Sequence, residues 1–157
     1  MNNNNYFTKE QALQKAKQFC AYQERCHSET KEKLYSFGLH KNDVEESLAI
    51  LIEENFLNEE RYAIAFAGGH FRTKQWGRVK IKYALSQKKV SAFCIKKALA
   101  QIDEADYEKC LQKLAKAKIV TLKNEKNVFI KMKKLQNYLL QKGYEGSLIS
   151  SILKTIV

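Results

Sequence analysis

The side chains with the greatest capacity for specific chemistry are basic, and they lie in one stretch of the chain. From Arg61 to Ile102 the sequence holds ten Lys or Arg residues and no Asp or Glu. Such a surface attracts phosphates or the carboxylates of another protein. The stretch therefore predicts a binding surface for an acidic partner, most simply a nucleic acid or a nucleoprotein assembly.

The pattern of reactive residues does not favour catalysis or metal binding. The four cysteines, Cys20, Cys26, Cys94 and Cys110, contain no CxxC pair, and the three histidines lack HxxxH spacing. No zinc site is therefore expected. No Walker loop and no Ser/His or Cys/His arrangement can be placed. We expect a protein that is not an enzyme and uses no cofactor, metal or small-molecule substrate.

Charge is distributed unevenly along the 157 residues. Residues 1–60 carry a balance of −4, residues 61–102 carry +10 and residues 103–157 carry +5, which gives a net charge of +11. Solubility alone would not require this concentration of positive charge.

No apolar run is long enough to span a bilayer, and the polar N-terminus is unlike a signal peptide. Four thiols without an export signal indicate the reducing cytoplasm.

Composition favours an all-α fold. Proline is absent, and Lys, Leu, Ala, Glu and Gln, which are good helix formers, are abundant. Residues that favour the N-cap position precede several segments in which apolar residues recur at helical spacing. We expect helices that begin at Thr8 (a capping box with Gln11), Ser28, Asn42 or Asp43, Asn58, Arg78 and Ser91, followed by helices over 107–117 and 126–141 and a short one carrying Ile149 and Ile152.

These segments repeat along the chain. Residues 34–39 align with residues 85–90 and 139–144, at offsets of 51 and 54, and the same offsets carry Val44 onto Ile95 and Ile149. Such periods are typical of helical arrays, in which each small unit is stabilised by packing against its neighbours. We predict three tandem three-helix repeats in an elongated, curved array: an N-terminal repeat over 1–57 with a frayed lead at 1–7, a central basic repeat over 58–102 and a C-terminal repeat over 103–157.

The helix expected from 78 to 87 has two distinct faces. A step of 100° per residue brings Arg78, Lys82 and Lys89 within about 40° of one another, which predicts one basic stripe. Val79 and Tyr83 lie roughly opposite the core face, and Trp76 comes just before the helix. These three residues could contact a neighbouring repeat or form a docking patch for a partner, and the sequence leaves both open.

Two glycines interrupt the preceding helix. Gly68 and Gly69 each cost about 1 kcal/mol relative to alanine in a helix. A pair of glycines within a helical pattern is more typical of close helix packing than of a phosphate-binding loop. We therefore expect the pair to permit another helix to approach.

The segment from 58 to 90 carries an ordered set of motifs. It has Asn58-Glu59-Glu60-Arg61, Phe66-Ala67, Arg72, Gly77-Arg78-Val79-Lys80-Ile81 and Leu85 to Val90. Their order and spacing resemble the signature of the RecX family, bacterial regulators of the RecA recombinase. Asn58 stands where the family usually has Asp, which keeps the capping function. Lys89 replaces a turn glycine, so we expect a turn that is either tighter or strained, and its positive charge joins the basic stripe.

The resemblance implies a non-enzymatic modulator that lodges in the groove of the RecA–DNA filament and inhibits its ATPase and recombinase activities. It would thereby modulate homologous recombination and DNA repair in the SOS response. The implied partners are the RecA filament and DNA, contacted directly or through the filament, and no membrane. The candidate binding residues are the basic positions of the matching motif, Arg72, Lys74, Arg78, Lys82 and Lys89, followed by Lys80, Lys88, Lys96 and Lys97.

Two other functions are compatible with the sequence. One is a basic helical DNA-binding module that does not contact the recombinase, and a weaker one is an RNA-associated helical array. No helix-turn-helix with a polar recognition face is evident, which disfavours sequence-specific base readout. A pull-down with recombinase, with and without single-stranded DNA and nucleotide, separates these functions.

Overall fold

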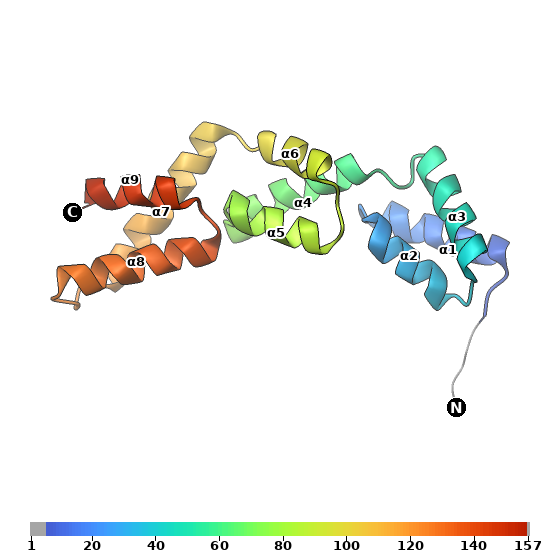
Figure 1. The fold of residues 1–157 in the computed structure, drawn as a ribbon, viewed down its shortest axis with the longest axis horizontal. Helices are drawn as coiled ribbons and strands as arrows, with labels where there is room; N and C mark the ends of the chain where they lie inside the picture. The colour runs from blue at the N-terminus through green and yellow to red at the C-terminus, as the bar shows by residue number, and fades with distance from the viewer. Residues whose placement is uncertain (1–5, 157) are drawn as a thin grey trace, which may run out of the picture. The chain divides into compact units, whose positions relative to one another are not determined.

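Within residues 6–156, which the computed structural model describes, every regular element is an α-helix (Figure 1). The prediction of an all-α fold is confirmed. None of the described helices is both long and apolar enough to cross a membrane. The helices are α1 (Lys9–Tyr22), α2 (His27–Ser36), α3 (Lys41–Glu53), α4 (Glu59–Lys74), α5 (Arg78–Gln87), α6 (Ala92–Ala100), α7 (Glu104–Thr121), α8 (Val128–Lys142) and α9 (Gly146–Ile156).

Polar side chains cap the helices at most of the predicted starts. The hydroxyl of Thr8 accepts a hydrogen bond from the Gln11 backbone N–H at 3.2 Å, and the Gln11 side chain accepts one from the Thr8 N–H. Asn58 accepts from the Arg61 N–H at 2.9 Å, at the start of α4. These bonds satisfy N–H groups that have no partner within their helix.

Four predicted starts are wrong by one to three residues. Helices α7 and α8 begin at Glu104 and Val128 rather than at 107 and 126. Helix α2 begins at His27, where the Glu29 carboxylate accepts from the Cys26 N–H at 2.9 Å. The Ser28 hydroxyl caps nothing, and instead donates to the Lys88 carbonyl at 2.9 Å. Helix α3 begins at Lys41, one residue before the predicted range.

The chain divides into two compact units. An N-terminal unit runs to Ala65 and also includes Leu85–Ile95, and a C-terminal unit holds Phe66–Ala84 and the chain from Lys96 onward. Helices α4, α5 and α6 therefore each contribute residues to both units. The boundaries at 57/58 and 102/103 divide the chain differently, so the residue ranges of the three repeats stay a prediction.

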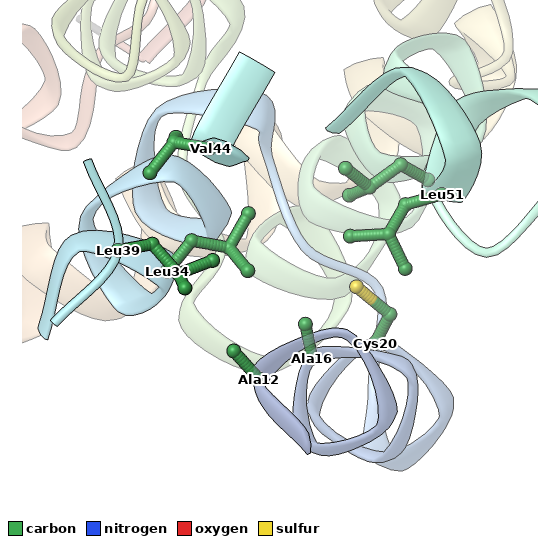
Figure 2. Packing of buried hydrophobic residues seen from close by; sticks show 8 residues of the cluster. Ala12, Ala16, Cys20, Leu34, Leu39, Val44 and Leu51 are labelled. Atoms are coloured by element: carbon green, nitrogen blue, oxygen red, sulfur yellow. The ribbon is translucent and has the colours of Figure 1, made fainter. Parts of the chain in front are cut away.

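The core of the N-terminal unit lies between α1, α2 and α3. Small residues on one side of α1, Ala12 and Ala16, face the fully buried Leu34 of α2 and Leu51 of α3 (Figure 2). Alanine on α1 lets the larger leucines approach its backbone. Burying each leucine contributes about 2 kcal/mol. Phe7 packs against this core as well.

Phe7 is not frayed, contrary to the expectation for the lead. Its N–H donates to the Phe37 carbonyl at 3.0 Å, and the two rings meet edge to face with centroids 5.5 Å apart. The aromatic pair ties the chain to the end of α2. Residues 1–5 of the predicted lead lie outside the described range.

The core of the C-terminal unit is built mainly by α7, α8 and α9. Helices α7 and α8 pack as a hairpin, and α9 packs on α8 (Figure 1). The fully buried side chains include two tyrosines, which need polar partners as well as space. The largest are Tyr107, Tyr144, Leu111, Leu135, Leu139 and Ile149.

Three helix ends adopt one left-handed turn at positions that the repeat alignment equates. Gly38 follows α2 with φ of 90°, Lys89 follows α5 with φ of 61° and Gly143 follows α8 with φ of 97°. In each copy the leucine four residues earlier is fully buried, and the residue after the turn is buried. The burial pattern therefore supports the predicted helical repeats.

Backbone hydrogen bonds explain why the left-handed residue is needed. After α5, the Val90 N–H donates to the Leu85 carbonyl at 3.1 Å, and after α8 the Tyr144 N–H donates to the Leu139 carbonyl at 3.2 Å. Such bonds satisfy helix-end carbonyls only when the chain reverses through positive φ. Glycine adopts this conformation freely, whereas Lys89 is strained in it. The positive φ of Lys89 agrees with the expectation of a tighter or strained turn at this position.

Replacing Lys89 with glycine should stabilise the protein by about 1 kcal/mol, because it removes the steric cost of a side chain at positive φ. The thermal midpoint should rise by about 2–4 °C. Lys88→Gly is the matched control, since it removes the same charge at a residue without positive φ, and it should not stabilise the protein. Calorimetry that finds equal midpoints for both variants would contradict the role of strain.

Candidate nucleic-acid interface

The predicted basic residues lie on three helices and one turn. Arg72 and Lys74 are in the last turn of α4, and Arg78, Lys80 and Lys82 are on α5. Two more lie in the turn after α5, and two lie on α6. These last four are Lys88, Lys89, Lys96 and Lys97. All nine come from the central segment, and Lys88 and Lys89 belong to the N-terminal unit whereas the others belong to the C-terminal unit.

The predicted stripe on α5 is wrong in one respect. Helix α5 ends at Gln87, and Lys89 lies beyond it in the left-handed turn. Its direction therefore does not follow the 100° step of a helix. Lys82 is exposed on α5 itself, whereas Arg78, at its first position, is largely buried.

Arg78 is held inside the C-terminal unit by carboxylates. Its side chain is 20% exposed, and its guanidinium pairs with Glu145 at 2.9 Å and with Glu104 at 2.5 Å. The guanidinium also lies over the Tyr107 ring, 3.8 Å from the centroid. A planar arginine can satisfy several such partners at once. These contacts give Arg78 a structural role, and contact with a ligand remains only a prediction.

Tyr107 links Arg78, the first residue of α5, to the carboxylate of Glu145 through hydrogen bonds. Its hydroxyl accepts a hydrogen bond from the Arg78 backbone N–H at 3.0 Å and donates one to Glu145. Burial, together with the hydrogen bond to Glu145, raises the pKa of Tyr107 above its usual value. Below the ordinary tyrosine pKa of about 10 the neutral phenol therefore stabilises the fold, and this contribution falls as the pH rises further.

The end of α8 and the start of α5 satisfy each other's backbone groups. The Gly77 N–H donates to the Lys142 carbonyl at 2.7 Å, and the Val79 N–H donates to the Gly143 carbonyl at 2.9 Å. The first N–H groups and the last carbonyls of helices lack partners within their own helix. A Cβ at Gly77 would lie 2.3 Å from the Gly143 oxygen, so only glycine permits this approach.

Trp76 is half-buried and is covered by two of the predicted binding residues. The ammonium groups of Lys74 and Lys80 lie 5.4 Å and 4.7 Å from the centroid of its ring, and His70 contacts it at 4.6 Å. Cation–π contacts at partly exposed sites contribute about 0.5–1 kcal/mol each. The lysines are thereby positioned by the tryptophan.

Val79 and Tyr83 have exposed side chains. Val79 is 53% exposed and Tyr83 is 67% exposed, one turn apart on α5. Of the two alternatives that the sequence left open, their exposure favours an apolar docking patch, whereas Trp76 is half-buried under Lys74 and Lys80. Docking at Val79 and Tyr83 stays a prediction.

A second arginine of the basic block is also held by intramolecular contacts. Arg61 pairs with Glu24 at 2.5 Å and donates to the Asn55 carbonyl at 3.1 Å, within the N-terminal unit. The sequence alone groups Arg61 and Arg78 with the lysines as unneutralised charges, because the carboxylate partners of both arginines lie outside residues 61–102. The residue type could have indicated these intramolecular ion pairs from the sequence, since arginine is favoured over lysine in partly buried ion pairs.

The two glycines of α4 do not serve close packing between helices as expected. A Cβ at Gly68 would meet the Arg72 guanidinium of the same helix at 2.7 Å, and a Cβ at Gly69 would meet nothing within 4 Å. Gly68 therefore gives room for the Arg72 side chain to fold back along α4. Within residues 6–156 no group of three or more His, Cys, Asp or Glu side chains is arranged so that it could hold a metal ion.

Gly77→Ala should destabilise the protein by more than about 2 kcal/mol, because the added methyl group meets rigid backbone on the facing chain. Gly69→Ala is the matched control, and it should stabilise α4 by about 1 kcal/mol since its Cβ enters open space. Urea unfolding measures both changes. If the two variants shift stability in the same direction, the contact between α5 and α8 is not the constraint described above.

Tyr107→Phe should cost about 1–3 kcal/mol at neutral pH, because it leaves the buried Arg78 N–H without a partner. Above about pH 10 the variant should lose stability less steeply than the parent protein, since it lacks one group whose folded pKa is raised. Tyr83→Phe on the exposed face of α5 is the control. Parallel stability curves for Tyr107→Phe and the parent between pH 9 and 11 would refute the pKa argument.

Comparison with known proteins links the basic segment to one family. Residues 58–99 match the model of the second three-helix domain of RecX. The chain is 33% identical over 133 residues to a regulatory protein RecX of Clostridium perfringens, and 32% identical over 127 residues to one of Clostridium tetani. These matches cover 84% and 80% of this chain.

A solved structure shares the fold. The crystal structure of RecX from Lactobacillus salivarius superposes with a TM-score of 0.84 at 24% identity, and the match covers 94% of this chain and 95% of the other. The chain spans 62% of the length of the C. perfringens relative and 58% of the C. tetani relative. The segment with the family match is the one that holds the basic side chains, Trp76 and Gly77.

Proposed function

We propose that this chain, which belongs to the RecX family, binds the filament that RecA forms on DNA and inhibits its ATPase and recombination activities. The observation that carries this proposal is the set of exposed lysines in the segment with the family match. Residues 61–102 contain no carboxylate that could neutralise them from within. A nucleoprotein filament presents phosphates and acidic side chains to such a surface.

Four lysines of this segment are the side chains most available for binding. Lys82, Lys88, Lys89 and Lys96 are exposed, and within residues 6–156 none of the four forms an ion pair. By contrast, Arg78 has carboxylate partners of its own. Removing the four lysines should therefore change binding without disturbing the core.

The cellular setting follows from the same family assignment. The protein would act in the cytoplasm, where DNA filaments form and where free thiols persist. All four cysteines lack a disulfide partner, which fits that compartment. The relatives are named regulatory proteins, and the proposal accordingly assigns a regulatory rather than a catalytic role.

The alternative function is a basic DNA-binding module that never contacts the recombinase. The exposed Val79 and Tyr83 favour the filament, because a solvent-exposed apolar pair suits a protein partner better than a phosphate backbone. A pull-down with purified recombinase, with and without single-stranded DNA and nucleotide, separates the two functions. Retention on naked DNA alone would favour the alternative.

Replacing Lys82, Lys88, Lys89 and Lys96 with glutamine should weaken filament binding and the inhibition of ATPase activity. If all four meet duplex phosphates, the slope of log affinity against log salt should flatten by about 3–4, because each contact releases about 0.9 counterion. The flattening should be smaller for single strands or protein carboxylates. The inhibition constant, measured across a salt series, gives this slope.

The matched control removes four exposed lysines from the C-terminal part of the chain, Lys116, Lys123, Lys126 and Lys133. It changes net charge by the same amount and should flatten the slope less. Equal losses from both sets would indicate diffuse electrostatic attraction. Undiminished inhibition by the first variant would place the binding surface elsewhere, and Val79 and Tyr83 would be tested next.

A further inference from the structure

A hollow of about 300 Å³ on the C-terminal unit lies between the end of α4 and the first half of α7. Its lining includes three cations, Arg72 from α4 and Lys109 and Lys113 from α7, and one anion, Asp106. Within residues 6–156 none of these three cations is ion-paired. The hollow therefore carries a net charge of about +2, which favours an anionic ligand.

The three cations reach the hollow for separate structural reasons. Lys109 and Lys113 are one turn apart, so they project from the same side of α7. The Arg72 guanidinium lies over the bare backbone of Gly68, where a Cβ would come within 2.7 Å of it. The sequence pattern indicates Arg72 but neither lysine, because both lysines lie outside the basic block and only the tertiary fold brings them to α4.

The hollow also has an aromatic wall. Phe71 is only partly exposed, lines the hollow and packs against Tyr107 with ring centroids 5.9 Å apart. Phe71 is the aromatic side chain of the lining, and stacking of an unpaired base on an aromatic side chain contributes about 1–3 kcal/mol. Bases in duplex DNA are stacked on one another and cannot stack on such a side chain.

We propose that this hollow binds a nucleotide unit of single-stranded nucleic acid, with Arg72, Lys109 and Lys113 around the phosphate and Phe71 against the base. The volume suits about one nucleotide at the lower limit of ligand-binding pockets. This inference rests on the proposed function for the presence of nucleic acid, and it adds a direct strand contact that extends from the central basic segment to Lys109 and Lys113 of α7.

The test uses the full chain and a fluorescein-labelled dT12 oligonucleotide, without recombinase, and measures affinity by fluorescence anisotropy. Lys109→Gln with Lys113→Gln should weaken binding about 5-fold or more, since two phosphate contacts are lost. Asp106→Asn should strengthen binding about 2-fold or more, because it removes the one negative charge of the hollow. A purely structural role for these residues would not produce a gain of affinity.

Lys116→Gln with Lys123→Gln is the matched control, because both lysines are exposed, neither lines the hollow and the charge change is the same. An equal loss of affinity in the control, or no gain from Asp106→Asn, would overturn the proposal. Equal affinity for a 12-base-pair duplex, or for free dTMP, would also overturn the assignment to a single strand.

Cys110 provides a local readout. Cys110 lines the hollow and is half-buried, and its thiol accepts a hydrogen bond from the Tyr144 hydroxyl at 3.2 Å. The other three cysteines, Cys20, Cys26 and Cys94, are buried. Bound dT12 should slow the alkylation of Cys110 by iodoacetamide, as followed by mass spectrometry. Unchanged alkylation at saturating dT12 would place the oligonucleotide elsewhere and overturn the inference. The proposed function is tested separately, since a parent chain that does not bind dT12 but is still retained in the recombinase pull-down contradicts this inference alone.

Discussion

The contact on which the C-terminal unit depends is the meeting of two helix ends. The last carbonyls of α8 accept hydrogen bonds from the first N–H groups of α5, so that backbone groups left over in both helices are satisfied together. This approach requires glycine at Gly77 and at Gly143, since a Cβ on either would overlap the facing chain. The fully buried Tyr107 and the partly buried Arg78 and Glu145 then form a hydrogen-bonded network beside it.

The basic residues have different roles according to their type. Arg61 and Arg78, with their planar guanidinium groups, bind carboxylates within the units. The exposed lysines of the same segment remain in solvent, where a charge contributes little to stability. Stability and binding therefore draw on different side chains, and the proposed interface can lose or gain lysines without loss of the fold. Lys74 and Lys80 are intermediate, because Trp76 positions both of them.

The left-handed turns show how a repeat can keep its geometry while its residues change. Gly38 and Gly143 adopt positive φ without cost, whereas Lys89 adopts it at the equivalent place with a side chain. The hydrogen bonds after α5 match those after α8, so the turn is imposed by the buried leucine and by the residue that follows. The strained lysine adds a positive charge to the segment with the family match. Strain retained at such a position is typical of a functional constraint.

Sequence alone determined the local and periodic features: the all-α fold, the caps at Thr8 and Asn58, the repeat offsets and the central concentration of positive charge. These depend on neighbours along the chain and on the helical period, which the sequence displays directly. Only the tertiary structure decided which cations are free, because the carboxylates that hold Arg61 and Arg78 are 37 and 67 residues away. For the same reason it alone brought Lys109 and Lys113 to Arg72. Contacts between distant segments depend on how the helices pack, and no local pattern encodes them.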